Sequence, residues 1–227
     1  MDKLKTHARF APTYIVGVLC WVYRVTTEIL RVTRLHGLEN LPSKKERLFI
    51  SSNHPSLLEP QVLVSLFGPE YIVRPYRYGP FSLADKKNYV TKWGGLFGLF
   101  IGERVIPIDR SGDGAPENAR AIRKFRKALV DGGSVIGFLE GSRTHSKKPG
   151  EWRSSCKGNT IRKLNGHFAW FAVKAGATII PVWCVRGKWL RLDVYIGKPV
   201  QTIPHEDACA IALRLEDTLL ALADSTN

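Results

Sequence analysis

A histidine and a glutamate stand five residues apart in a segment that directly follows a short apolar run. The segment reads Ser51-Ser52-Asn53-His54-Pro55-Ser56-Leu57-Leu58-Glu59-Pro60. A neutral imidazole can accept a proton from a hydroxyl near pH 7, and a carboxylate on its other nitrogen fixes the tautomer and stabilises the cation that forms. Such a pair is the base and the orienting group of a nucleophilic triad. His54 and Glu59 are therefore candidate catalytic residues, with the nucleophile supplied by a hydroxyl of the substrate.

Glu59 also has a structural alternative, a helix capping box with Ser56 at the N-cap and Glu59 at the third helical position. Pro60 argues against it, because a helix that began at Ser56 would place the proline ring against the Ser56 carbonyl. Proline fits better as the first helical residue. We therefore expect Glu59 to lie just outside the helix in an extended conformation, with residues 54–59 forming a loop that folds the carboxylate onto the imidazole.

Three later segments each contain an apolar, strand-like run. Two of them carry a glutamate and end on an arginine, and the third is a strand broken by a proline. They are Gly102–Arg110, Phe138–Arg143 and Ile179–Val182. Together with His54 and Glu59, in this order, they resemble the four motifs of the glycerolipid acyltransferase family, in its lysophosphatidic acid acyltransferase (PlsC-like) group. The resemblance spans residues 38–200.

The chain departs from the family's pattern in three places. The family's first motif is His, any four residues, then Asp, so Glu59 makes this chain an HX4E variant. Leu139 stands where the family usually has a proline in the third motif. Residues 142–145 only approximate the usual Thr-Arg-Ser. These differences bear on the acceptor more than on the chemistry.

The resemblance implies transfer of a fatty acyl group from an acyl thioester of coenzyme A or acyl carrier protein, with no other cofactor. The implied acceptor is a hydroxyl of a lysophospholipid or glycerol phosphate, most specifically 1-acylglycerol-3-phosphate. His54 is implied to be the base and Glu59 its orienting carboxylate. Five further residues are implied to bind the acceptor. Two of them are arginines, whose guanidinium groups match phosphate oxygens. They are Arg110, Glu140, Gly141, Ser142 and Arg143.

The composition predicts the charge of a partner and not its chemical class. The 227 residues carry 34 Lys plus Arg against 20 Asp plus Glu, a formal net charge of +14, which suits nucleic acid, anionic lipid or a polyanionic thiol cofactor. With 44% hydrophobic and 24% charged residues, the chain is neither disordered nor an integral membrane bundle. Its four cysteines form no C-x-x-C pair, which favours reduced thiols and a cytosolic environment. The histidines show no metal-ligand spacing, so we expect no metal site.

The N-terminal segment 1–34 combines apolar residues with arginines. Its apolar run, 14–23, is about ten residues long and ends at Arg24, whereas a helix that spans a bilayer needs about 20. Mixed apolar and basic residues continue to Arg34, which is typical of an amphipathic helix in the membrane interface. Packing of this helix on the core is the alternative. We expect a peripheral or monotopic protein on the anionic, cytoplasmic face of a membrane.

A second segment, 71–93, interleaves aromatic residues with Lys and Arg. The mixture suits a membrane interface, where aromatic rings lie at headgroup depth and cations meet anionic lipid. A surface loop with ordinary packing and a site for single-stranded nucleic acid are alternatives. Nucleic acid ranks last of the three, so we expect no nucleic-acid partner.

Strand and helix patterns alternate after a connector at residues 35–42. Apolar residues at helical spacing predict helices after Pro60, over residues 116–132 and over residues 205–223. An apolar run predicts a buried strand at 48–52, and runs rich in β-branched residues predict strands at 105–109, 134–139, 179–185 and 192–196. We expect an α/β fold with a mixed or largely parallel sheet covered by helices. An amphipathic helical segment, 1–34, would precede a catalytic domain, 35–227.

Two other functions stay open. The same chemistry could serve an amine or glycolipid acceptor, or the scaffold could bind lipid or nucleic acid without turnover. The intact pair of His54 and Glu59 argues against a pure binding protein, because binding alone needs no base.

Overall fold

The computed structural model describes residues 2–56, 58–73, 78–87, 104–109, 115–141, 144, 150–188, 191–203 and 205–226. Its α-helices are α1 (Asp2–Ile29), α2 (Glu59–Ser65), α3 (Gly68–Val73), α6 (Ala115–Val130), α7 (Gly166–Lys174) and α8 (Ala208–Asp224), and η1 (Leu38–Asn40) is a short 3-10 helix. Its strands are β1 (Thr33–His36), β2 (Leu48–Ser52), β3 (Phe81–Asp85), β4 (Val105–Ile108), β5 (Val135–Gly137), β6 (Trp152–Ser154), β7 (Thr160–Arg162), β8 (Thr178–Arg186) and β9 (Leu192–Ile196).

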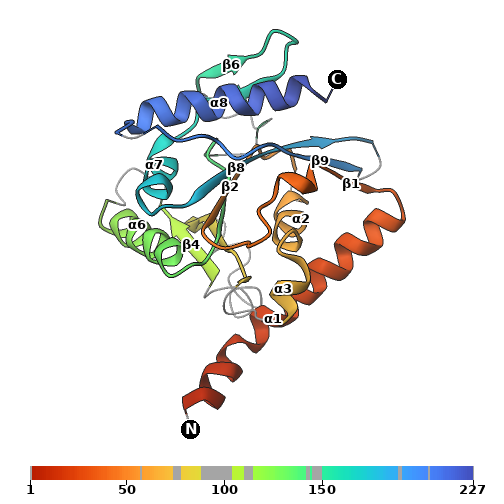
Figure 1. Ribbon diagram of the computed structural model, residues 1–227, viewed down its shortest axis with the longest axis vertical. Helices are drawn as coiled ribbons and strands as arrows, with labels where there is room; N and C mark the ends of the chain where they lie inside the picture. The colour runs from red at the N-terminus through yellow and green to blue at the C-terminus, as the bar shows by residue number, and fades with distance from the viewer. Residues whose placement is uncertain are drawn as a thin grey trace.

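The centre of the fold is a largely parallel sheet. Within the described residues, seven strands pair in the order β1-β9-β8-β2-β5-β3-β4, and β6 and β7 form a separate antiparallel pair. In the large sheet β8 and β9 are antiparallel, whereas the other neighbouring strands are parallel. The predicted mixed, largely parallel sheet covered by helices is confirmed (Figure 1).

Successive residues of the central strands pack on opposite faces of this sheet. Phe49 of β2 belongs to the hydrophobic cluster beneath α6, α7 and α8, whereas Leu48 and Ile50 belong to the cluster beneath α1, α2 and α3. Alternate side chains of a strand point to opposite faces, so a strand covered on both sides is apolar without alternation. The continuous apolar run at the start of β2 is therefore a consequence of the two helical layers (Figure 1).

Two expectations about the strands are wrong. β8 runs through Pro181 without a break, because only the proline's own N–H is missing from the ladder, and its carbonyl still accepts the Gly197 N–H at 2.9 Å. The connector expected at 35–42 is in part a strand, since Thr33–His36 form β1 and pair with β9. This strand also straddles the expected domain boundary at residue 34.

The described part of segment 71–93 contributes to the core and to the sheet. Tyr71 of α3 is only 4% exposed, and residues 81–85 form β3 beside β5. Residues 74–77 and 88–93 lie outside the described residues. The idea that this whole segment is a surface loop is therefore wrong for β3, and its expected membrane contact stays a prediction.

Helix α1 packs on the core with one face. A Cβ atom at Gly17 would lie 2.5 Å from the Tyr71 ring, so the missing side chain is what lets α1 approach α3. Tyr23 packs against the hydrophobic cluster beneath α2. The packing that we considered as the alternative for this helix is thus present.

Another face of α1 exposes an apolar stripe. Its residues are spaced by four, three and seven positions, which places them on one side of a helix. They are Ile15, Leu19, Val22 and Ile29, with exposed fractions of 47–75%. Among the described helices, none combines the length and the hydropathy that crossing a bilayer would require.

Candidate active site

The sheet brings the sequence-distant motifs to one edge. Strands β2, β3, β4, β5 and β8 run in the same direction, so their carboxyl ends meet at this edge. His54 follows β2, Glu140 follows β5, and Asp109, the residue before Arg110, follows β4. In open α/β sheets ligands bind outside the carboxyl ends of the strands. The edge centred on β2 is therefore the candidate active site.

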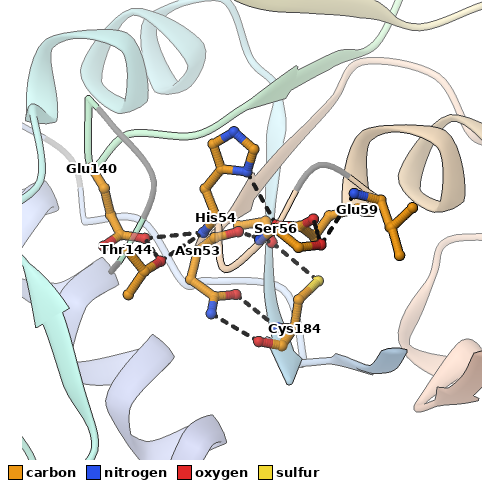
Figure 2. A network of polar contacts seen from close by, with 9 residues as sticks. Asn53, His54, Ser56, Glu59, Glu140, Thr144 and Cys184 are labelled. Atoms are coloured by element: carbon orange, nitrogen blue, oxygen red, sulfur yellow. Dashed lines mark hydrogen bonds and ion pairs between the residues drawn. The ribbon is translucent and has the colours of Figure 1, made fainter. Parts of the chain in front are cut away.

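The imidazole of His54 is held by Glu59 and by an aromatic neighbour. Nδ1 of His54 lies 3.1 Å from Oε1 of Glu59, whose side chain is fully buried. The His54 ring stacks on Phe138, with 4.3 Å between ring centroids and 24° between the planes. Nε2 has no hydrogen-bond partner among the described residues and points away from Glu59 (Figure 2). The ring thus presents one nitrogen to the carboxylate and the other to a substrate.

Glu59 also bonds to Ser56, so it makes a contact expected of the capping box as well as the contact with His54 that the catalytic interpretation requires. The Ser56 N–H donates to Oε1 of Glu59 at 2.7 Å, and the Ser56 hydroxyl donates to Oε2 at 2.5 Å. The expectation of an extended Glu59 outside the helix is wrong, because α2 begins at Glu59 with Leu58 as its N-cap. Pro60 takes the second helical position, where a missing N–H removes no intrahelical bond.

These donors keep the Glu59 carboxylate ionised. Burial alone would raise the pKa of Glu59, but the hydrogen bonds from the His54 ring and from the Ser56 hydroxyl and N–H lower it below its ordinary value. An ionised carboxylate beside Nδ1 favours the tautomer that carries its proton there. The lone pair on Nε2 is then available to accept a proton from a hydroxyl.

Glu140 contacts the protein with both of its carboxylate oxygens. Oε1 accepts the His54 N–H at 3.0 Å and the Thr144 hydroxyl at 2.5 Å, and Oε2 accepts the Arg162 N–H at 3.3 Å. Burial raises the pKa of Glu140, although these hydrogen bonds act in the opposite direction. Its expected contact with acceptor hydroxyls stays a prediction. Both oxygens of this carboxylate already accept hydrogen bonds from the protein.

Of the other predicted acceptor-binding residues, the structure describes Gly141, which follows Glu140. Gly141 has φ of +72°, a left-handed conformation that glycine adopts without strain. A Cβ atom built on it would meet no atom within 4 Å, so the conformation, and not a close contact, is what calls for glycine here. Arg110, Ser142 and Arg143 lie outside the described residues, and their roles stay predictions.

Three residues of the site were not predicted as site residues. Asn53 donates to the Cys184 carbonyl at 2.9 Å and accepts the Cys184 N–H at 2.7 Å, which ties the end of β2 to β8. Ser56 holds Glu59, and Thr144 holds Glu140 and His54. Polar residues next to a fully buried strand must find partners when they are buried too, and this rule could have drawn attention to Asn53.

A hollow of about 860 Å³ lies beside the turn that follows β5, and neither His54 nor Glu59 is among the described residues that line it. Leu139, Glu140 and Gly141 form one part of its lining, and the first residues of α7 and α8 form another. Its volume is in the range of small-molecule sites, about 300–1,000 Å³. In the part of the chain that the structure describes, no three His, Cys, Asp or Glu side chains are grouped as metal ligands would be.

Comparisons with known proteins agree with this geometry. The family model named Acyltransferase matches residues 32–185. A solved structure, the 1-acyl-sn-glycerophosphate (LPA) acyltransferase PlsC from Thermotoga maritima, is similar with a TM-score of 0.59 and 16% sequence identity, over 95% of this chain and 81% of that one. At this identity the likeness is one of fold. No curated protein sequence matches the chain.

The Asn53 bonds generate a stability prediction. Asn53→Ala would leave the buried N–H and carbonyl of Cys184 without their partners, and we expect the free energy of unfolding to fall by about 2–4 kcal/mol. The measurement is urea unfolding, with a lower midpoint at an unchanged m value.

Asn118→Ala is the matched control. Asn118 makes the same two bonds to the main chain of Asp109 but is only half-buried, so water can replace them at a cost of about 1 kcal/mol or less. An equal loss in both variants would contradict the importance of burial at Asn53.

Proposed function

Because the chain belongs to the Acyltransferase family, we propose that it transfers a fatty acyl group from an acyl thioester to a hydroxyl of a lysophospholipid or glycerol-phosphate acceptor. The most specific form of the proposal is 1-acylglycerol-3-phosphate as the acceptor. The observation that carries it is the buried Glu59 carboxylate on Nδ1 of His54, at the carboxyl end of the central strand. The similar Thermotoga maritima structure is that of a 1-acyl-sn-glycerophosphate acyltransferase, which supports the choice of acceptor.

The reaction starts with proton transfer to His54. Nε2 takes the proton of the acceptor hydroxyl while its oxygen attacks the carbonyl carbon of the thioester, and the new C–O bond forms. Glu59 stabilises the imidazolium through the hydrogen bond of 3.1 Å at Nδ1. General-base catalysis of this kind contributes about 10²–10⁴ in rate.

The reaction ends with departure of the thiol. The C–S bond breaks, and the imidazolium returns its proton through Nε2 to the leaving sulfur, which yields the free thiol and the acyl ester. His54 is then neutral again. The thiol belongs to coenzyme A or acyl carrier protein, and the chemistry needs no other cofactor.

The acceptor phosphate is assigned to the arginines that the family motifs supply. The guanidinium groups of Arg110 and Arg143 bind phosphate oxygens in a forked geometry. Ser142 adds a hydroxyl, Glu140 binds acceptor hydroxyls or holds the arginines, and Gly141 allows close approach of the main chain. The carboxyl ends of β4 and β5, which precede these residues, lie at the same edge as His54.

A panel assay tests the proposal. Purified protein is incubated with acyl-coenzyme A or acyl-acyl carrier protein and with lysophosphatidic acid, glycerol 3-phosphate, an amine and a glycolipid, and the products are identified by mass spectrometry. Acylated lysophosphatidic acid is the expected main product. Products from another acceptor alone would overturn the acceptor assignment, and no product at all would favour a lipid- or nucleic-acid-binding protein.

Substitutions at the pair test the mechanism. His54→Ala should lower kcat by about 10²–10⁴ in a protein that still folds, because the general base is lost. Glu59→Gln should lose much of the activity, since an amide cannot stabilise imidazolium, and Glu59→Asp should retain part of it. The readout is the initial rate of thiol release.

His36→Ala is the control, because His36 also lies near a carboxylate, at 4.0 Å from Asp193, but is the last residue of β1, which runs opposite to β2. It should keep full activity. Wild-type turnover by a folded His54→Ala protein would contradict the proposed mechanism.

We propose in addition that the protein is peripheral or monotopic on the cytoplasmic face of an anionic membrane. The apolar stripe of α1 supports this, because apolar side chains exposed in a row are those of an interfacial helix. The net charge of +14 supports the anionic surface. The basic residues and the other aromatic residues of segment 71–93 would add to the contact, although Tyr71 itself is buried.

A paired substitution tests the stripe. Leu19→Gln with Val22→Gln should weaken binding to anionic vesicles by about tenfold or more, because each apolar side chain that leaves water contributes about 1.5–3 kcal/mol. Binding of the wild type should rise with anionic lipid and fall with salt. Vesicle flotation measures both, and a thermal melt checks the fold.

Val130→Gln with Leu213→Gln is the matched control, since these exposed apolar residues belong to α6 and α8 on the other face of the sheet. Vesicle binding that is unchanged by the α1 substitutions would contradict the proposal. Removal of residues 1–34 is a poorer test, because it would also remove half of β1 and the packing of α1 on α3.

A further inference from the structure

The main chain of His54 is clamped by the turn that follows β5. The His54 N–H points at two oxygens, Oγ1 of Thr144 at 2.9 Å and Oε1 of Glu140 at 3.0 Å. The His54 carbonyl accepts the Thr144 N–H at 2.9 Å. Both main-chain polar groups of the candidate base are therefore bonded to the third motif (Figure 2).

The Thr144 hydroxyl is the link that closes this clamp. It donates its proton to Oε1 of Glu140 at 2.5 Å, so its lone pairs face the His54 N–H. A side chain that donates and accepts at once is needed at this point, and serine or threonine supplies it. Thr144 and Glu140 are 1% and 6% exposed, and their polar groups face His54 and the Arg162 N–H.

The side chain of His54 has few constraints of its own. Its ring is held by one hydrogen bond to Glu59 and by stacking on Phe138, and it is 18% exposed. The direction in which Nε2 points is then set by where the main chain places Cα and Cβ. A displacement of about 1 Å at a catalytic group can cost about 10²-fold in rate.

We propose that Thr144 and Glu140 are positioning residues that act through the main chain of His54 and set the direction of its imidazole. The inference rests on the proposed acyl transfer for its effect on rate. It assigns to Glu140 a role inside the protein, which differs from a contact with the acceptor. It also makes Thr144, which stands where the family's usual third motif ends on a serine, necessary for full activity in this chain.

The kinetic test uses isosteric substitutions. Thr144→Val keeps the branched shape and removes the hydroxyl, and it should lower kcat about tenfold while KM for the acceptor stays within about twofold. Thr144→Ser restores the hydroxyl and should recover at least about a third of the wild-type kcat. Glu140→Gln should behave as Thr144→Val, with kcat lowered and KM unchanged.

Thr33→Val is the matched control. Thr33 is also buried, and its hydroxyl has no hydrogen-bond partner among the described residues, so kcat should not change. A Thr144→Val enzyme with wild-type kcat would overturn the inference. A higher KM with unchanged kcat in Glu140→Gln would overturn it too, because that result describes a residue that binds substrate.

A second measurement needs no activity. In protein labelled with ¹⁵N-histidine, the His54 amide should exchange its hydrogen at least about tenfold faster in Thr144→Val than in wild type and in Thr33→Val, because one of its acceptors is gone. Equal exchange rates would overturn the clamp. A wild-type protein without acyl transfer would instead overturn the proposed function, whatever the exchange rates are, so the two failures are distinguishable.

Discussion

The buried carboxylate of Glu59 is the constraint on which the rest of the site depends. A buried charge is tolerated only where hydrogen bonds replace the water that it lost. Here the donors are the His54 ring and the hydroxyl and N–H of Ser56. Their arrangement fixes the loop before α2 and turns one nitrogen of His54 inward. The same two oxygens thus orient the base and hold the segment that precedes the helix.

Contacts with the neighbouring strands of the sheet position the segment that carries His54. Asn53 ties the end of β2 to Cys184 of β8, and Glu140 after β5 holds the next residue, His54. The base is therefore fixed from both neighbouring strands, on a rigid element and not on a free loop. The helical layers then divide the surface, with the exposed apolar stripe on α1 on one side of the sheet and α6, α7 and α8 on the other (Figure 1).

The parts of this arrangement that the sequence predicted are those that depend on local pattern. β2 is predicted correctly from its apolar start and β9 from its β-branched residues, and the motif at His54 is recognised from spacing alone. The start of α2 was missed by one residue, because contacts of Glu59 with two other side chains outweigh the local preference of the residue before proline. Thr144 was missed because its partner His54 is 90 residues away, a separation that no local pattern encodes. β3 was missed because its strand pattern lies inside a segment whose aromatic and basic residues indicated a surface.

The central claim is that Glu59 is an ionised carboxylate that holds His54 as the Nδ1–H tautomer. Because the folded-state pKa of Glu59 is lowered from its ordinary value of 4.5, its contribution to stability is present above that value and is lost as the pH falls through the lowered pKa. An NMR titration of protein labelled with ¹³C-glutamate and ¹⁵N-histidine measures both groups at once. The account predicts that the Glu59 carboxyl carbon titrates below pH 4.5 and that neutral His54 carries its proton on Nδ1. A Glu59 that titrates above 4.5, or a neutral His54 protonated on Nε2, would contradict it.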